Sequence, residues 1–133
     1  MMAYPILEFD PTLEAFIEPS KIIHARDLPE HCVICFFKEV IDKIVAEYEA
    51  KIMVENYWED GSHNIYEISH RSQRLAFFHP GVGAPIAAGL LAESIAFGCR
   101  KFIACGGCGN LEKEIAGGHR NIISGANRDG GGL

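Results

Sequence analysis

The sequence lacks the features of several classes of protein. No stretch is strongly basic, and Asp and Glu outnumber Lys and Arg by 18 to 12, for a net charge of −6. A nucleic acid is therefore a poor partner. Residues 1–16 contain neither a basic segment nor a long apolar run, so we expect no signal peptide and a cytoplasmic location. The apolar stretch 84–98 is interrupted by Glu93 and Ser94 and is too short for a bilayer, so we expect no membrane association.

The sequence also lacks a convincing metal pattern. Its six histidines show no His-x-x-x-His spacing, and we expect no metal and no cofactor. The five cysteines predict reduced thiols. Cys105 and Cys108 have Cys-x-x-Cys spacing, but no clear helix follows to lower a thiol pKa. Cys32 and Cys35 would point to opposite faces of a strand, so they cannot complete a zinc site. A thiol or zinc protein is therefore the last of the alternatives.

What is present is the composition of one ordinary domain. Hydrophobic residues make up 48% of the 133 residues and charged residues 23%, a balance typical of folded domains. We expect a single domain over residues 1–133. Four prolines punctuate residues 1–30, which we expect to be irregular, with at most two helical turns in residues 11–19.

The remaining residues alternate between strand and helix patterns. Apolar residues at three- and four-residue spacing predict two amphipathic helices. Short apolar runs predict strands, two of them joined as a hairpin. This order predicts an α/β protein, a three-layer sandwich around a mostly parallel mixed sheet. The expected helices are 38–50 and 84–97, and the expected strands are 31–37, 51–58, 65–70, 74–79, 101–105 and, more weakly, 119–124.

Two glycine loops follow predicted strands of this sheet. Ligands of such sheets bind beyond the carboxyl ends of the strands, and glycines allow the backbone to approach a ligand closely. Free amides at the start of the 84–97 helix could bind a phosphate, a ribose hydroxyl or a carboxylate. A tight turn without a ligand is the alternative. His79, beside the first loop, and Arg128, near the end, are weaker candidates. The candidate ligand-binding residues are Gly81, Val82, Gly83, Gly106, Gly107, Cys108 and Gly109.

The segments around these loops carry a family pattern. Gly81-Val82-Gly83-Ala84-Pro85 is followed by Glu93-Ser94-Ile95, by Gly98-Cys99-Arg100-Lys101-Phe102 and by Gly106-Gly107-Cys108-Gly109-Asn110-Leu111. Over residues 66 to 131 the sequence resembles the nucleoside phosphorylases of the purine nucleoside/uridine phosphorylase class. The resemblance implies phosphate-dependent cleavage of the N-glycosidic bond of a purine or pyrimidine nucleoside. Phosphate is then a co-substrate, and neither a metal nor a covalent nucleophile takes part.

The sequence departs from the family pattern at the phosphate side. Ala104 stands where relatives usually place a phosphate-binding Arg, and Gly107 replaces a Ser or Thr. Glu18-Pro19-Ser20-Lys21 is at best a degenerate counterpart of an early phosphate loop, and Gly130 replaces a Glu. The resemblance covers only the family's N-terminal half, so we expect a truncated domain. Whether it is an active enzyme is left open.

A truncated sheet has a consequence for assembly. It would expose a strand edge and an apolar face, and both favour association into a homo-oligomer. The alternative to a phosphorylase is a non-catalytic nucleoside-binding or assembly module.

Overall fold

A five-stranded sheet lies at the centre of the computed structural model, which describes residues 11–115 and 117–126. The strands lie in the order β2-β5-β6-β1-β7, and a separate two-stranded ribbon joins β3 to β4. The elements are α1 (Pro19–Ile22), β1 (His31–Cys35), α2 (Lys38–Glu47), β2 (Lys51–Val54), β3 (Tyr57–Trp58), β4 (Gly61–Ser62), β5 (Ile65–His70), β6 (Gln73–Phe78), α3 (Ala84–Phe97) and β7 (Lys101–Cys105).

The sheet is mixed: β2, β6, β1 and β7 run in one direction, and β5 alone runs in the opposite direction. β1 pairs in parallel with both β6 and β7, whereas β5 pairs antiparallel with both β2 and β6. The α/β class, the hairpin of β5 and β6, and the crossover from β6 through α3 to β7 are confirmed. Because β1, β6 and β7 run in the same direction, their carboxyl ends meet at one edge of the sheet.

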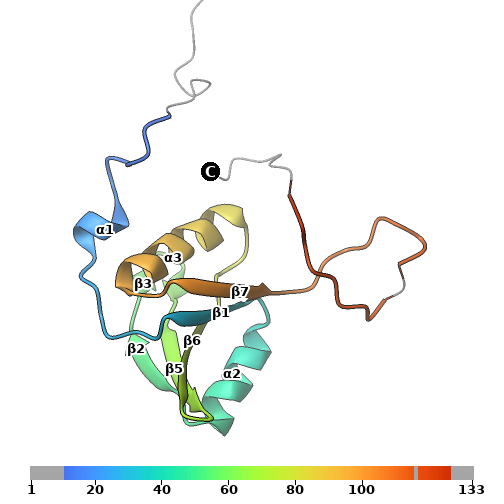
Figure 1. Cartoon of the computed structure of the whole chain (residues 1–133), viewed down its shortest axis with the longest axis horizontal. Helices are drawn as coiled ribbons and strands as arrows, with labels where there is room; N and C mark the ends of the chain where they lie inside the picture. The colour runs from blue at the N-terminus through green and yellow to red at the C-terminus, as the bar shows by residue number, and fades with distance from the viewer. Residues whose placement is uncertain (1–10, 116, 127–133) are drawn as a thin grey trace, which may run out of the picture.

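The two longer helices cover opposite faces of this sheet (Figure 1). Alternate residues of each strand point to opposite faces. On the α3 face, Ile34 and Phe78 pack in one core cluster with Leu90 of α3. On the α2 face, Phe77 and Ile41 form a smaller cluster with Cys35. The three-layer arrangement is therefore confirmed, with the larger core beneath α3.

Helix α3 has the expected bounds because both ends are marked in the sequence. Pro85 stands in its first turn, where a missing N–H costs nothing. Gly98 ends the helix with φ 138°, and its N–H donates to the carbonyl oxygens of Ser94 and Ile95. A side chain at this left-handed position would also crowd the Arg26 carbonyl oxygen at 3.0 Å.

Three expectations were wrong in detail. The strand expected at 51–58 is divided, because a register shift follows Ile52 in β2 and the chain then turns into the β3–β4 ribbon. The helical turns expected within 11–19 are instead the single turn α1, which begins at Pro19. Residues 119–124 form no strand, and the side chains of Ile122 and Ile123 are exposed with no sheet beside them in the described part of the chain.

Strand β7 lies at the edge of the sheet, and β1 is its only strand neighbour among residues 11–115 and 117–126. Ile103 of β7 is 70% exposed. Directly after β7, residues 106–115 extend away from the sheet (Figure 1). Within the described ranges, none of the helices combines the length and the apolar character needed to cross a membrane.

Candidate functional site

Three loops meet at the carboxyl edge of the parallel strands. Phe36 and Phe37 follow β1, the segment from His79 follows β6, and Gly106 follows β7. The backbone N–H of Phe36 donates to the carbonyl oxygen of Cys105 at 3.0 Å, which extends the β1–β7 pairing to the last residue of β7. Both glycine loops therefore lie at the edge where the sequence places them.

The first glycine loop has a conformation that requires glycine. Gly81 has φ 71° and Gly83 has φ 104°, values that side chains disfavour. A Cβ on Gly81 would stand 2.4 Å from the Cγ2 atom of Ile86. The Gly81 N–H donates to Nδ1 of His79 at 3.1 Å. His79 is therefore an acceptor at Nδ1, so a neutral imidazole carries its proton on Nε2.

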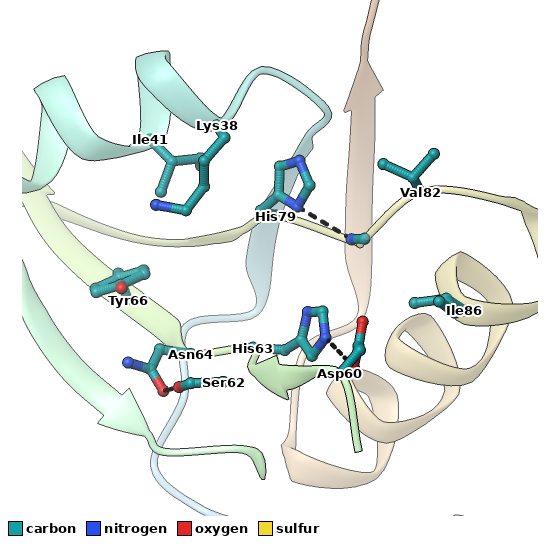
Figure 2. Close-up of a pocket in the computed structure, with 11 residues that line it drawn as sticks. Lys38, Ile41, Asp60, Ser62, His63, Asn64, Tyr66, His79, Val82 and Ile86 are labelled. Carbon is teal, nitrogen blue, oxygen red and sulfur yellow. Dashed lines mark hydrogen bonds and ion pairs between the residues drawn. The ribbon is translucent and has the colours of Figure 1, made fainter. Parts of the chain in front are cut away.

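A cavity of about 360 Å³ opens between this loop, the start of α2 and the segment joining β4 to β5 (Figure 2). Its size is that of a small-molecule site, and its wall is mixed in character. Ile41, Val82 and Ile86 supply apolar surface, while polar side chains come from all three segments. The remaining lining residues are Lys38, Asp60, Ser62, His63, Asn64, Tyr66, His79 and Gly81.

An Asp–His pair forms part of the cavity wall. Nε2 of His63 lies 2.9 Å from Oδ1 of Asp60, and the His63 side chain is only 10% exposed. The hydrogen bond from His63 lowers the pKa of Asp60 below its usual value. The ring of Trp58 meets the ring of His63 edge-on, with centroids 6.0 Å apart. These contacts fix the imidazole beside the first glycine loop.

Glu93 links helix α3 to the β3–β4 ribbon that carries this pair. Its Oε2 atom accepts hydrogen bonds from Nδ2 of Asn56 at 2.6 Å and from Nε1 of Trp58 at 3.1 Å. Trp58 packs closely over Gly89 of α3, where an added Cβ would stand 2.6 Å from the indole. Sequence reasoning missed this assembly. The only signal for it was a single acidic residue in an otherwise apolar helix.

Two helix N-termini face the same edge without side-chain caps. α2 begins after Phe37 and α3 after Gly83, and neither residue provides a side-chain hydrogen bond to the first turn. The backbone amides of a first turn have no partner within the helix, and they carry partial positive charge. Lys38, at the start of α2, forms an ion pair with Asp42 and also lines the cavity.

The second glycine loop lies outside the cavity. Gly106, Gly107, Cys108 and Gly109 are all exposed. A Cβ added to Gly106 would stand 3.2 Å from the ring of Phe36, and one added to Gly107 would stand 3.7 Å from the ring of Phe37. The two loops thus share an edge but do not form one cavity. A ligand role for the second loop stays a prediction, as does that of Gly81, Val82 and Gly83. Arg128 lies outside the described residues.

All five cysteines are free, and Cys35 and Cys105 are register partners on the neighbouring strands β1 and β7. Cys32 belongs to the core on the α3 face and Cys35 to the core on the α2 face, so the expected opposite orientation is confirmed. Over the ranges that the structure describes, no three His, Cys, Asp or Glu side chains are grouped as metal ligands would be.

Comparison with known proteins identifies the family. The family model of the phosphorylase superfamily matches residues 30–132, which is most of the chain. The match begins earlier than the motifs at residues 66 to 131 and includes β1, α2 and β2. No individual curated protein matches the sequence significantly. The chain belongs to the phosphorylase superfamily.

Proposed function

From membership of the phosphorylase superfamily, we propose that this protein binds a nucleoside and phosphate at the carboxyl edge of β1, β6 and β7. The proposed reaction is the phosphate-dependent cleavage of the N-glycosidic bond. The observation that carries the proposal is the cavity at this edge, whose wall includes His79, Gly81 and Val82 of the first glycine loop. That loop lies within the region matched by the superfamily.

Phosphate is the ligand that the helix N-termini favour. The uncapped first turns of α2 and α3 offer backbone N–H groups, and their dipoles favour an anion. Lys38 adds a positive charge on the cavity wall, which its ion pair with Asp42 partly offsets. We place the phosphate between the start of α2 and the first glycine loop, because Lys38, Gly81 and Val82 line the same cavity.

The nucleoside requires a surface that is part apolar and part polar. Ile41, Val82 and Ile86 would contact the faces of the base or sugar, and Ser62 and Asn64 would accept or donate hydrogen bonds. In phosphorolysis, a phosphate oxygen attacks C1′ as the bond to the base breaks, and positive charge develops on the ribosyl group. The protein would contribute by positioning both substrates and stabilising this charge.

A direct test measures base release from inosine, adenosine and uridine, with and without phosphate. We expect release only with phosphate. We also expect Lys38→Met to raise the KM for phosphate about tenfold, since a hydrogen bond to a charged group contributes about 1.5–3 kcal/mol. Lys43→Met is the matched control, because Lys43 lies on the same helix but pairs with Glu47 away from the cavity. Base release no greater than in the phosphate-free blank would contradict phosphorolysis by this chain.

A second candidate function is nucleoside binding without turnover. It is favoured by the second glycine loop, where Ala104 and Gly107 provide no polar side chain at positions that the family resemblance assigns to phosphate ligands. Titration calorimetry separates the two candidates. Saturable nucleoside binding in the absence of any base release would establish the binding module, and binding with phosphate-dependent release would establish the enzyme.

Homo-oligomer formation also stays a proposal, supported by the edge position of β7 and by the exposure of Ile103. Light scattering at micromolar concentration tests it, and a monomer would contradict it. A cytoplasmic location remains a prediction from the sequence.

A further inference from the structure

Two pairs of cysteines face each other, and they differ in their access to solvent. Cys32 and Cys99 are both buried in the core on the α3 face, at 1% and 0% exposure. Cys35 and Cys105 end the neighbouring strands β1 and β7, and they are directly opposite in the parallel register. Cys35 is buried, whereas Cys105 is exposed. Only the second pair can therefore be reached by a reagent in solution.

The backbone brings Cys35 and Cys105 to a separation that a disulfide can span. Neighbouring strands lie about 4.8 Å apart, and the Cα atoms of a disulfide are about 4.4–6.8 Å apart. Residues in register on adjacent parallel strands point to the same face of the sheet. Cys35 and Cys105 are register partners at the ends of β1 and β7, so the two side chains start from opposed Cα atoms on one face.

We propose that Cys35 and Cys105 form a redox-active dithiol, which small-molecule disulfides such as oxidised glutathione convert into a disulfide between β1 and β7. The thiolate of Cys105 attacks one sulfur of the reagent, and one molecule of the small thiol leaves. The thiolate of Cys35 then attacks the sulfur of Cys105, and the second small thiol leaves. The protein loses two hydrogen atoms, which the two released thiols carry.

The environment of Cys105 determines the rate of its exchange with the small-molecule disulfide. Burial and the neighbouring Cys35 raise the pKa of the Cys105 thiol above its ordinary value. The thiolate is the reactive form, so the exchange is slow at neutral pH. Below the pKa, the thiolate fraction grows about tenfold for each pH unit. Once Cys105 is in the mixed disulfide, the adjacent Cys35 has a high effective concentration, which favours the second step.

The new bond would tie the second glycine loop to the sheet. Gly106 directly follows Cys105, Phe36 directly follows Cys35, and the Phe36 N–H already donates to the Cys105 carbonyl oxygen at 3.0 Å. β1 is also the only strand that holds β7 within the described ranges. The disulfide therefore fixes the end of the edge strand from which the loop emerges, and it is independent of which reaction the first-loop cavity supports.

The test incubates the reduced full chain with oxidised glutathione at pH 7 and at pH 8. We expect a single peptide-mapped link, between Cys35 and Cys105, and about a tenfold faster loss of these two thiols at pH 8. The exposed Cys108 can take up glutathione but forms no link within the chain. Urea unfolding of the oxidised chain should show a higher midpoint, since the bond constrains the unfolded chain. Reduction with dithiothreitol should restore all five thiols.

Variants identify the two sulfur atoms. Cys35→Ala should leave Cys105 at the mixed-disulfide stage with one bound glutathione. Cys105→Ser should keep Cys35 reduced, and Cys108→Ser, at an exposed position, should form the disulfide as the unaltered chain does. A link between Cys105 and Cys108, or a Cys35 that remains reduced throughout, would overturn the proposal. Cys105 and Cys108 are exposed, so Cys105→Ser and Cys108→Ser should leave the fold intact. These two variants therefore test the proposal even if Cys35→Ala does not fold.

Discussion

The two glycine loops follow strands of the same sheet and end at the same edge, yet they have different surroundings. Gly81 of the first loop is buried and donates a hydrogen bond to His79, and the chain continues into α3. Residues 106–109 of the second loop are exposed, and no helix or strand follows them in the described part of the chain. Similar glycine patterns therefore led to one defined cavity wall and one open segment.

The difference arises from the strands that precede the loops. β6 lies inside the sheet between β5 and β1, and its last three residues are buried. β7 pairs with β1 alone in the described ranges, and four of its five residues are exposed. A loop is held in place by packing from the elements around it. The first loop has neighbours from α2, β4 and α3, whereas in the described part of the chain Gly106 and Gly107 have Phe36 and Phe37 nearest to them.

The largest loss of stability is expected at the buried end of β6, the strand that precedes the first glycine loop. Phe78→Ala, at the end of β6, removes a ring that is 1% exposed and should cost about 3–5 kcal/mol in the free energy of unfolding. Ile103→Ala on β7 removes a side chain that is 70% exposed and should change it by less than about 0.5 kcal/mol. Urea unfolding measures both. Equal losses would show that the two strands are equally packed.

The glycines themselves give the next comparison. Gly81→Ala places a Cβ 2.4 Å from Ile86 at a residue with φ 71°, so we expect a loss of about 2–4 kcal/mol. Gly109→Ala meets no atom within 4 Å and should change the stability by less than about 0.5 kcal/mol. The same unfolding measurement applies. If Gly81→Ala proved as stable as Gly109→Ala, the first loop would not be held in the conformation described.

Sequence reasoning located the elements that have local signals. Helix α3 was predicted with its true bounds because Pro85 and Gly98 mark its ends, and β7 because the apolar run Phe102–Cys105 stops at Gly106. The edge position of β7 within the sheet is not local. It depends on which strands flank β1, and the sequences of the two glycine loops do not indicate the order of the strands in the sheet.

The missed part of the candidate site is built from distant residues. Asp60 and His63 are close in sequence, but they border the cavity only because the β3–β4 ribbon packs against α3. That contact depends on the bonds from Asn56 and Trp58 to Glu93, which lie 37 and 35 residues apart in the chain. The spacing of apolar residues along the sequence does not predict a hydrogen bond between residues so far apart. The in-register pairing of Cys35 with Cys105 also joins distant residues, so the sequence did not predict it. The sequence shows only the local Cys105-x-x-Cys108 spacing.

A third prediction tests how the wall of the first loop is anchored. Glu93→Ala removes the acceptor of two hydrogen bonds and leaves the Trp58 indole N–H partly buried, so we expect a loss of about 1–3 kcal/mol. Glu112→Ala, after the second loop, is the control and should be nearly neutral, because Glu112 is exposed. Trp58 fluorescence can follow the unfolding, since Trp58 is the single tryptophan of the chain. If Glu93→Ala cost no more stability than Glu112→Ala, the bonds from Asn56 and Trp58 to Glu93 would not stabilise the fold.

The smallest expected effect depends on pH. His63 lowers the pKa of Asp60 below its ordinary value of 3.8, so the charged form of Asp60 is favoured in the folded protein. A group with a lowered pKa stabilises the fold above its ordinary pKa, and this stabilisation is lost as the pH falls through the lowered value. Asp60→Asn should therefore unfold at a lower urea concentration than the unaltered chain at pH 6, and this difference should shrink below pH 4.

The control for this comparison is Glu114→Gln, which removes the same charge from the exposed segment after the second loop. It separates a contact with His63 from a general effect of net charge, which stands at −6 in the whole chain. Because Asp60 is exposed, solvent screening keeps the effect small. If both variants showed the same dependence on pH, the Asp60–His63 contact would contribute nothing to stability. If only Asp60→Asn showed this dependence on pH, the contact between Asp60 and His63 in the cavity wall would be shown to stabilise the fold.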